Sequence, residues 1–121
     1  MKALLYIFIG GGLGAVVRYG ISILAPLQAH RFPWATLIAN VVAALVVGWA
    51  MQASPKTSDP QKYLFLVTGF CGGLSTFSTF SLETIQLLQR GDLWSAGWNI
   101  ALNVLLSLLA VAWLAQRGAS I

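Results

Sequence analysis

Apolar residues fill long stretches of this chain that contain almost no charged positions. Uncharged intervals cover residues 3–17, 19–30, 32–55, 63–82 and 93–116, and only Arg18 separates the first two. A helix needs about 20 apolar residues to cross the hydrocarbon core of a bilayer, so these intervals predict four spanning helices. We place them at about 3–25, 34–52, 62–89 and 93–116. The expected fold is an all-α membrane protein, with residues 1–121 forming a single four-helix transmembrane domain.

The composition supports a membrane protein and argues against several other classes. Hydrophobic residues make up 58% of the chain and charged residues 8%, whereas about 25% of an ordinary soluble domain is charged. The net charge of +4 comes from basic residues that are spread singly, so no basic patch favours nucleic acid as a partner. The chain has no paired carboxylates within its spans, no paired histidines and no metal-ligand cluster, so we do not expect an enzyme.

The basic residues at the ends of the spans give little preference for one orientation in the membrane. Four spans would place both termini on one side of the bilayer, and that side would carry Lys2, Lys56, Lys62 and Arg117. The other side would carry Arg31 and Arg90, and Arg18 if it reaches that surface. Loop Lys and Arg counts set orientation, and this difference is small. The hypothesis is therefore that the chain inserts both ways and pairs as an antiparallel, dual-topology homodimer.

The third span is the most unusual, because a glycine cluster and a ladder of hydroxyls interrupt its apolar residues. We expect the helix to be broken or distorted near Gly72-Gly73. Phe77 and Phe80 are three residues apart and therefore share a helix face. The edge of a phenyl ring is electropositive, so ring edges that point inward can attract a small anion with the moderate strength that conduction requires. Packing against core or lipid is the alternative for both rings.

Polar side chains in the other spans have two interpretations each. Asn40, the strongly polar residue of the second span, can form an interhelical hydrogen bond or donate an N–H to a passing anion. Arg18 can extend to the membrane surface, or act as a fixed charge that draws anions or pairs with Glu83. Asn99 and Asn103 lie one turn apart on the fourth span, and we interpret them as packing residues.

The glycine-rich segment of the first span does not indicate a nucleotide site. Gly10 to Ala15 formally matches a dinucleotide-binding fingerprint, but that fingerprint needs a preceding strand and an acidic residue about 20 positions later. The first acidic residue here is Asp59. Gly10 and Gly14 instead form a GxxxG pair, a pattern that lets a second membrane helix approach closely.

Three segments of the chain resemble the Fluc (CrcB) family of bacterial fluoride channels. They are Gly11 to Tyr19, Pro33 to Asn40, and above all Gly69 to Glu83, which has the pattern Gly-Phe-Cys-Gly-Gly-Leu-Ser-Thr-Phe-Ser-Thr-Phe-Ser-x-Glu. The last pattern is specific to the family and the first two support it. The resemblance covers almost the whole chain. Ser75 departs from the family in standing where threonine is frequent, and Trp34-Ala35 replaces the more usual x-Gly before Thr36.

The resemblance implies a dual-topology homodimer with two pores and a central structural sodium ion. Transferred position by position, it makes Phe77 and Phe80 an aromatic box along the fluoride path and Asn40 the pore amide. Further roles follow for other residues: Ser78, Thr79 and Glu83 form a polar track, Arg18 is the cation of the vestibule, and Gly72 and Ser75 bind sodium through their carbonyls.

The expected function is passive export of fluoride down its electrochemical gradient through the inner membrane of a bacterium. That activity would limit fluoride toxicity in the cytoplasm. A proton-coupled exporter similar to the small multidrug transporters is the main alternative, although those depend on an acid in the first helix and this first helix has none. A membrane assembly subunit that conducts no ions is the third possibility.

Overall fold

The computed structural model describes residues 1–25, 32–53 and 59–119, and within these ranges all regular secondary structure is helical. Four segments there are long and apolar enough to cross a membrane: Lys2–Leu24, Trp34–Gln52, Pro60–Gln89 and Leu93–Gly118. The prediction of an all-α membrane protein with four spans is therefore confirmed. Arg31 and Lys56, which entered the orientation count, lie outside the described residues.

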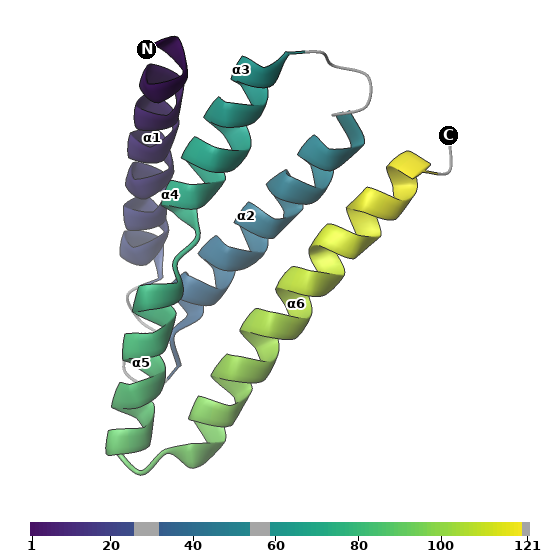
Figure 1. Ribbon diagram of the computed structural model, residues 1–121. Helices are drawn as coiled ribbons and strands as arrows, with labels where there is room; N and C mark the ends of the chain where they lie inside the picture. Colours follow the sequence, from purple (N-terminus) through teal and green to yellow (C-terminus); the bar gives the residue numbers. More distant parts are fainter. Residues whose placement is uncertain (26–31, 54–58, 120–121) are drawn as a thin grey trace.

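The four spans are arranged as two neighbouring pairs. Helix α1 (Lys2–Leu24) packs along the first half of the third span, and α2 (Trp34–Ala53) packs along α6 (Leu93–Ala119). The start of α1 and the end of α6 lie at the same end of the bundle, as an even number of crossings requires (Figure 1). The second half of the third span lies at the opposite end, beside the beginning of α6 (Figure 1).

Glycines bring α1 and the third span into contact at the level of their backbones. A Cβ atom added to Gly10 or Gly14 would overlap a backbone oxygen of the third span, and one added to Gly73 would overlap Gly11 O. A Cβ atom on Gly69 would lie 2.8 Å from Ile7 O, which is also too close. The close helix approach expected from the GxxxG pair is therefore present. Packing of this kind leaves no room for a side chain between the two helices at these glycines.

The third span contains four helical pieces instead of one uniform helix. It begins with α3 (Pro60–Tyr63), continues as the π-helical segment η2 (Leu64–Cys71) and the short α4 (Gly72–Leu74), and ends with α5 (Phe77–Gln89). Between α4 and α5 the backbone of Ser75 and Thr76 is extended, with ψ angles of 152° and 120°. The extended pair lies two residues beyond Gly72-Gly73, where the sequence analysis expected the break.

A glycine turn reverses the chain between α5 and α6. Gly91 has a positive φ of 78°, a conformation that glycine adopts readily. The N–H groups of Gly91 and Asp92 donate to Leu88 O and Leu87 O at 3.0 Å, which is the hydrogen-bond pattern of a Schellman motif. Asp92 Oδ1 then accepts from Ser95 N at 3.0 Å and caps the first turn of α6.

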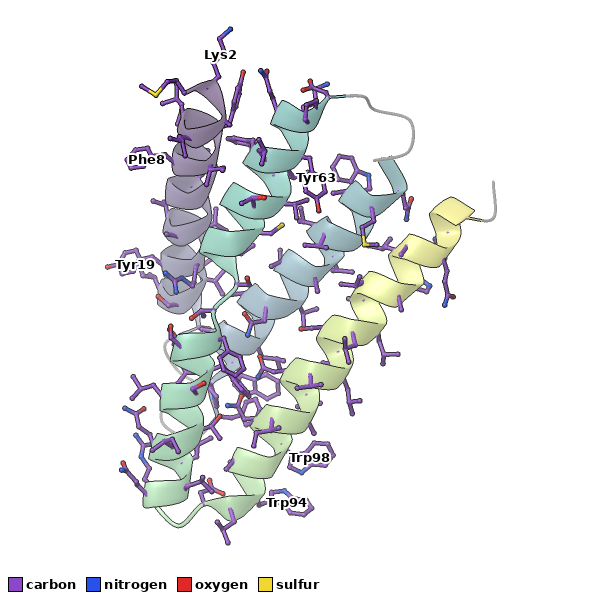
Figure 2. The ribbon with its side chains drawn as sticks, viewed as in Figure 1. Lys2, Phe8, Tyr19, Tyr63, Trp94 and Trp98 are labelled. Carbon is purple, nitrogen blue, oxygen red and sulfur yellow. The ribbon has the colours of Figure 1, made fainter. Side chains whose placement is uncertain are left out.

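Large apolar side chains cover the outside of the bundle, whereas small ones fill its centre. The buried cluster consists of Ala39, Ala43, Cys71 and Leu74. Phe8, Tyr19, Trp94 and Trp98 point away from the helices (Figure 2), and Phe8 and Trp94 are 78% and 77% exposed. Side chains of this kind are stable on an outer surface when lipid surrounds it, so the surface agrees with a multi-pass membrane protein.

Candidate functional site

The candidate site is built around the interruption of the third span. At this point Thr76 N donates to Asn40 Oδ1 at 2.9 Å, and Asn40 Nδ2 lies 3.5 Å from Thr76 O. The side-chain amide on α2 thus takes the place of a helical backbone partner for Thr76. A break inside a membrane is tolerated when its polar groups find partners of this kind.

Three other polar groups of the break, the N–H and hydroxyl of Ser75 and the hydroxyl of Thr76, are bonded locally. The N–H and the hydroxyl of Ser75 both donate to Cys71 O, at 2.9 Å and 2.7 Å. Thr76 Oγ1 accepts from Thr79 N at 3.1 Å and is therefore the N-cap of α5. Because Thr76 N is turned towards Asn40, it does not bond to Gly72 O, the acceptor it would have in a continuous α-helix.

One side of the break opens into a cavity that we call the phenylalanine groove. It has a volume of about 340 Å³. Its lining residues come from α2, the third span and α6: Asn40, Ala43, Ala44, Val47, Cys71, Ser75, Thr76, Phe77, Phe80, Asn103, Val104 and Ser107. The rings of Phe77 and Phe80 face each other with centroids 5.6 Å apart and planes inclined at 44°. The structure therefore brings together Asn40, Phe77 and Phe80.

A second cavity, which we call the Glu83 hollow, also includes Thr76 in its wall. Its volume is about 260 Å³, and its lining residues are Ala15, Arg18, Tyr19, Ser22, Ala35, Thr36, Thr76, Thr79 and Glu83. A further cavity of about 230 Å³ shares Ser22, Ala35 and Glu83 with it and includes Arg90. Thr79 and Glu83 thus line a different cavity from the two phenyl rings, although all four residues belong to α5.

Glu83 is held by a hydroxyl of α2. Its Oε1 accepts from Thr36 Oγ1 at 2.9 Å, while its buried Oε2 has no hydrogen-bond partner among the described residues. Arg18 lines the same hollow. Within the part of the chain that the structure describes, Arg18 and Glu83 form no ion pair, and Glu83 accepts a hydrogen bond from Thr36 instead.

Ser78 lines neither the phenylalanine groove nor the Glu83 hollow. It is exposed, and its hydroxyl lies 3.4 Å from Thr76 Oγ1. Of the polar residues on α5, Ser78 is therefore nearest to the break but turned towards the outer surface of this chain.

Gly72 and Ser75 present backbone carbonyls at the break. Gly72 is exposed, and a Cβ atom added to it would meet nothing within 4 Å. Its carbonyl has lost the usual helical donor, as described above. The described residues contain no group of three or more His, Cys, Asp or Glu side chains placed to hold a metal, so a cation in this region would depend on backbone oxygens.

The sequence analysis missed a chain of polar side chains that continues from Asn40. Asn40 Nδ2 donates to Asn103 Oδ1 at 2.8 Å, and Asn103 Nδ2 donates to Asn99 Oδ1 at 2.9 Å. Asn99 Nδ2 in turn donates to Thr84 Oγ1 at 2.9 Å. The one-turn spacing of Asn99 and Asn103 was visible in the sequence, but it did not indicate which residue on α2 they would meet.

Comparison with known proteins gives consistent results. Residues 5–115 match the family described as "CrcB-like protein, Camphor Resistance (CrcB)". The chain is 46% identical over 112 residues to a protein of Pyrococcus horikoshii named "Fluoride-specific ion channel FluC", and the match covers 91% of this chain and 90% of that relative. Proteins with the same name from Serratia proteamaculans and Cronobacter sakazakii are 42% and 40% identical, covering 94% and 93% of this chain and 97% and 90% of theirs.

Proposed function

The chain belongs to the CrcB family, and on this premise we propose that it is a fluoride-selective ion channel. It lets fluoride leave the cytoplasm passively, through the inner membrane where the host is a bacterium. The names of relatives that match nearly the whole chain support this function. The observation that carries it in the structure is the meeting of Asn40, Phe77 and Phe80 in one groove beside a break in a membrane helix.

The groove has the groups needed to replace water around a small anion. Asn40 provides an amide N–H, and the two inclined rings of Phe77 and Phe80 can present electropositive edges. Ring edges attract an anion less strongly than a fixed positive charge does, so the ion can enter and also leave. A larger halide would fit the same narrow group of donors poorly, which accounts for selectivity.

Thr76 gives the proposed path its continuity, because it lines both the phenylalanine groove and the Glu83 hollow. An ion that leaves the rings would next meet the hydroxyl of Thr79 and then the region of Glu83. The exposed hydroxyl of Ser78 would join this polar track where a second copy covers it. Arg18 in the wall of that hollow supplies a positive charge, which raises the local concentration of anions at the mouth.

The working unit that we propose is an antiparallel, dual-topology homodimer. Phe77 is 80% exposed in the single chain, although its ring belongs to the proposed path, and a second copy would enclose it. At the centre of this dimer a sodium ion would bind to the carbonyls of Gly72 and Ser75 from both copies. The open face of Gly72 and the lost helical donor of its carbonyl support this arrangement. The positive charge of the ion would offset the repulsion between the carbonyl oxygens of the two copies.

The orientation of the chain can be tested in cells with a tag at each terminus. Dual topology predicts that tags at either terminus are accessible from both sides of the membrane. A single orientation would contradict the antiparallel dimer but would leave fluoride conduction open.

Fluoride efflux from vesicles tests the function directly. Purified protein in liposomes loaded with fluoride should release it, as measured with a fluoride electrode, and without any need for a pH gradient. Phe77→Ile and Phe80→Ile should each reduce the efflux by about tenfold or more, because isoleucine keeps the bulk but removes the ring edge. Phe8→Ile is the matched control, since Phe8 is 78% exposed and points away from the bundle (Figure 2).

If Phe77→Ile and Phe80→Ile both release fluoride at the wild-type rate, the proposed role of the rings is falsified. Efflux that requires a pH gradient would indicate the proton-coupled exporter. An absence of any flux from folded wild-type protein would indicate a subunit that does not conduct.

A further inference from the structure

The amide groups that continue from Asn40 all donate in the same direction. Asn40 donates to Asn103, and Asn103 donates both to Asn99 O at 2.8 Å and to Asn99 Oδ1 at 2.9 Å. Asn99 donates to Thr84 Oγ1, and the hydroxyl of Thr84 donates to Phe80 O at 2.7 Å. The chain of donors thus begins at the proposed pore amide and ends at the backbone of a proposed pore ring.

Two backbone groups fix the orientation of every amide in this chain. Asn99 O is a backbone carbonyl and accepts only, so Asn103 must turn its Nδ2 towards it and its Oδ1 towards Asn40. At the other end, Thr76 N is a backbone donor and requires Asn40 Oδ1. Both constraints give Asn40 the same orientation, in which its Nδ2 faces Asn103, and both residues line the groove.

This orientation leaves one N–H of Asn40 available to an anion. The first hydrogen on Nδ2 is used at 2.8 Å by Asn103 Oδ1. The second has only the 3.5 Å contact with Thr76 O, a length at which a hydrogen bond is weak. If the amide were turned by half a rotation, it would present an oxygen to the groove and repel an anion.

We propose that Asn103, Asn99 and Thr84 are positioning residues for fluoride conduction, a role that rests on the proposed function. They hold the Asn40 amide with its N–H towards the phenylalanine groove and join it to the turn of α5 that carries Phe80. Asn99 is 0% exposed, Thr84 is 7% exposed, and neither lines the groove. These two residues therefore act on the ion only through the chain of hydrogen bonds.

Substitutions of Thr84 distinguish a positioning role from direct contact with the ion. Thr84→Val keeps the shape of the side chain but removes the acceptor of Asn99 Nδ2, so the Asn99 side chain is free to rotate. Asn103 then loses its bond to Asn99 Oδ1 and keeps only the bond to the backbone carbonyl Asn99 O, so it holds Asn40 less firmly. Thr84→Ser keeps the hydroxyl and should restore the wild-type behaviour. Ser81→Ala is the matched control: Ser81 also lies on α5 and donates to a carbonyl four residues earlier, that of Phe77 at 2.8 Å, but it accepts no amide.

Fluoride efflux should be measured at low protein density, where most active liposomes contain one channel. The rate per active liposome then reports conduction by each channel, and the fraction of active liposomes reports how much protein assembles. We expect Thr84→Val to lower the rate per active liposome by about tenfold, as the loss of one buried acceptor predicts. Thr84→Ser and Ser81→Ala should keep both quantities within about twofold of wild type, and Asn99→Leu should behave as Thr84→Val does.

Three outcomes separate this proposal from the others. If Thr84→Val lowers only the fraction of active liposomes, the chain of amides is structural and positioning is overturned. Positioning is also overturned if Thr84→Val and Asn99→Leu both conduct as wild type does. If the wild-type protein itself releases no fluoride, the proposed function fails, and that result is seen before any variant is compared.

Discussion

The first half of the third span, from α3 to α4, packs backbone to backbone against α1, whereas α5 meets its neighbours through polar side chains. Gly69 and Gly73 allow the first contact, and no side chain lies between the two helices there. At α5, the carboxylate of Glu83 and the backbone N–H of Thr76, the N-cap residue, bond to side chains of α2. The hydroxyl of Thr84 accepts from Asn99 on α6. The two halves belong to one span but follow different packing rules.

This difference accounts for the phenylalanine groove and the Glu83 hollow, which both include residues of α5 in their walls. Backbone packing at the glycines leaves no room for a side chain between α1 and the third span. Polar side chains reach across a gap, and they leave room beside them for an ion. The first half therefore fixes the position of the break, and the second half supplies the lining of the groove and the hollow.

Substitution of Gly14 should disturb the backbone packing of the first half most severely. A Cβ atom there would overlap Phe70 O and lie 2.8 Å from Leu74 N, and neither backbone atom can move aside. We expect Gly14→Ala to cost at least about 3 kcal/mol of stability, seen as loss of folded protein on size-exclusion chromatography. Gly12→Ala, where a Cβ atom would meet nothing within 4 Å, is the control. A Gly14→Ala protein that folds and melts like wild type would contradict backbone packing.

Thr76→Val tests the polar half and should have a smaller effect. The substitution removes the N-cap of α5 near the middle of the span, where water is not available to replace it. We expect a loss of about 2 kcal/mol and faster hydrogen exchange at the N–H of Thr79. Thr76→Ser keeps the cap and should keep both properties. Unchanged exchange at Thr79 in the valine variant would show that the hydroxyl is not the partner that holds this N–H.

Features that depend on local pattern were predictable from the sequence. The apolar intervals predicted the four spans, and the GxxxG pair predicted that a second helix would approach the first one closely. Each of these follows from residues that are neighbours in the sequence. The shared groove of Phe77 and Phe80 belongs here as well, because their spacing already placed them on one helix face.

Features that depend on partners from another helix were not predictable. The extended residues are Ser75 and Thr76 because Asn40, 36 positions earlier, accepts the Thr76 N–H. The separation of Glu83 from the rings likewise depends on Thr36, which holds its carboxylate on the side of the hollow. Asn99 and Asn103 had a visible spacing, but their connection to Asn40 needed the packing of α2 against α6.

Asp59→Ala should cause the smallest loss of stability. It tests the N-cap of α3, as Thr76→Val tests the N-cap of α5. Asp59 Oδ1 accepts from Gln61 N at 3.1 Å and Lys62 N at 3.4 Å, outside the long apolar stretch. Water can solvate these N–H groups when the carboxylate is removed, so we expect a loss of about 1 kcal/mol or less. Fluoride efflux per channel should be unchanged, because Asp59 lines neither the groove nor the hollow.

Thermal unfolding of Asp59→Ala beside Thr76→Val measures the difference between a cap in water and a cap within the membrane. Equal losses for the two variants would mean that water reaches the break between α4 and α5 as freely as it reaches the start of α3.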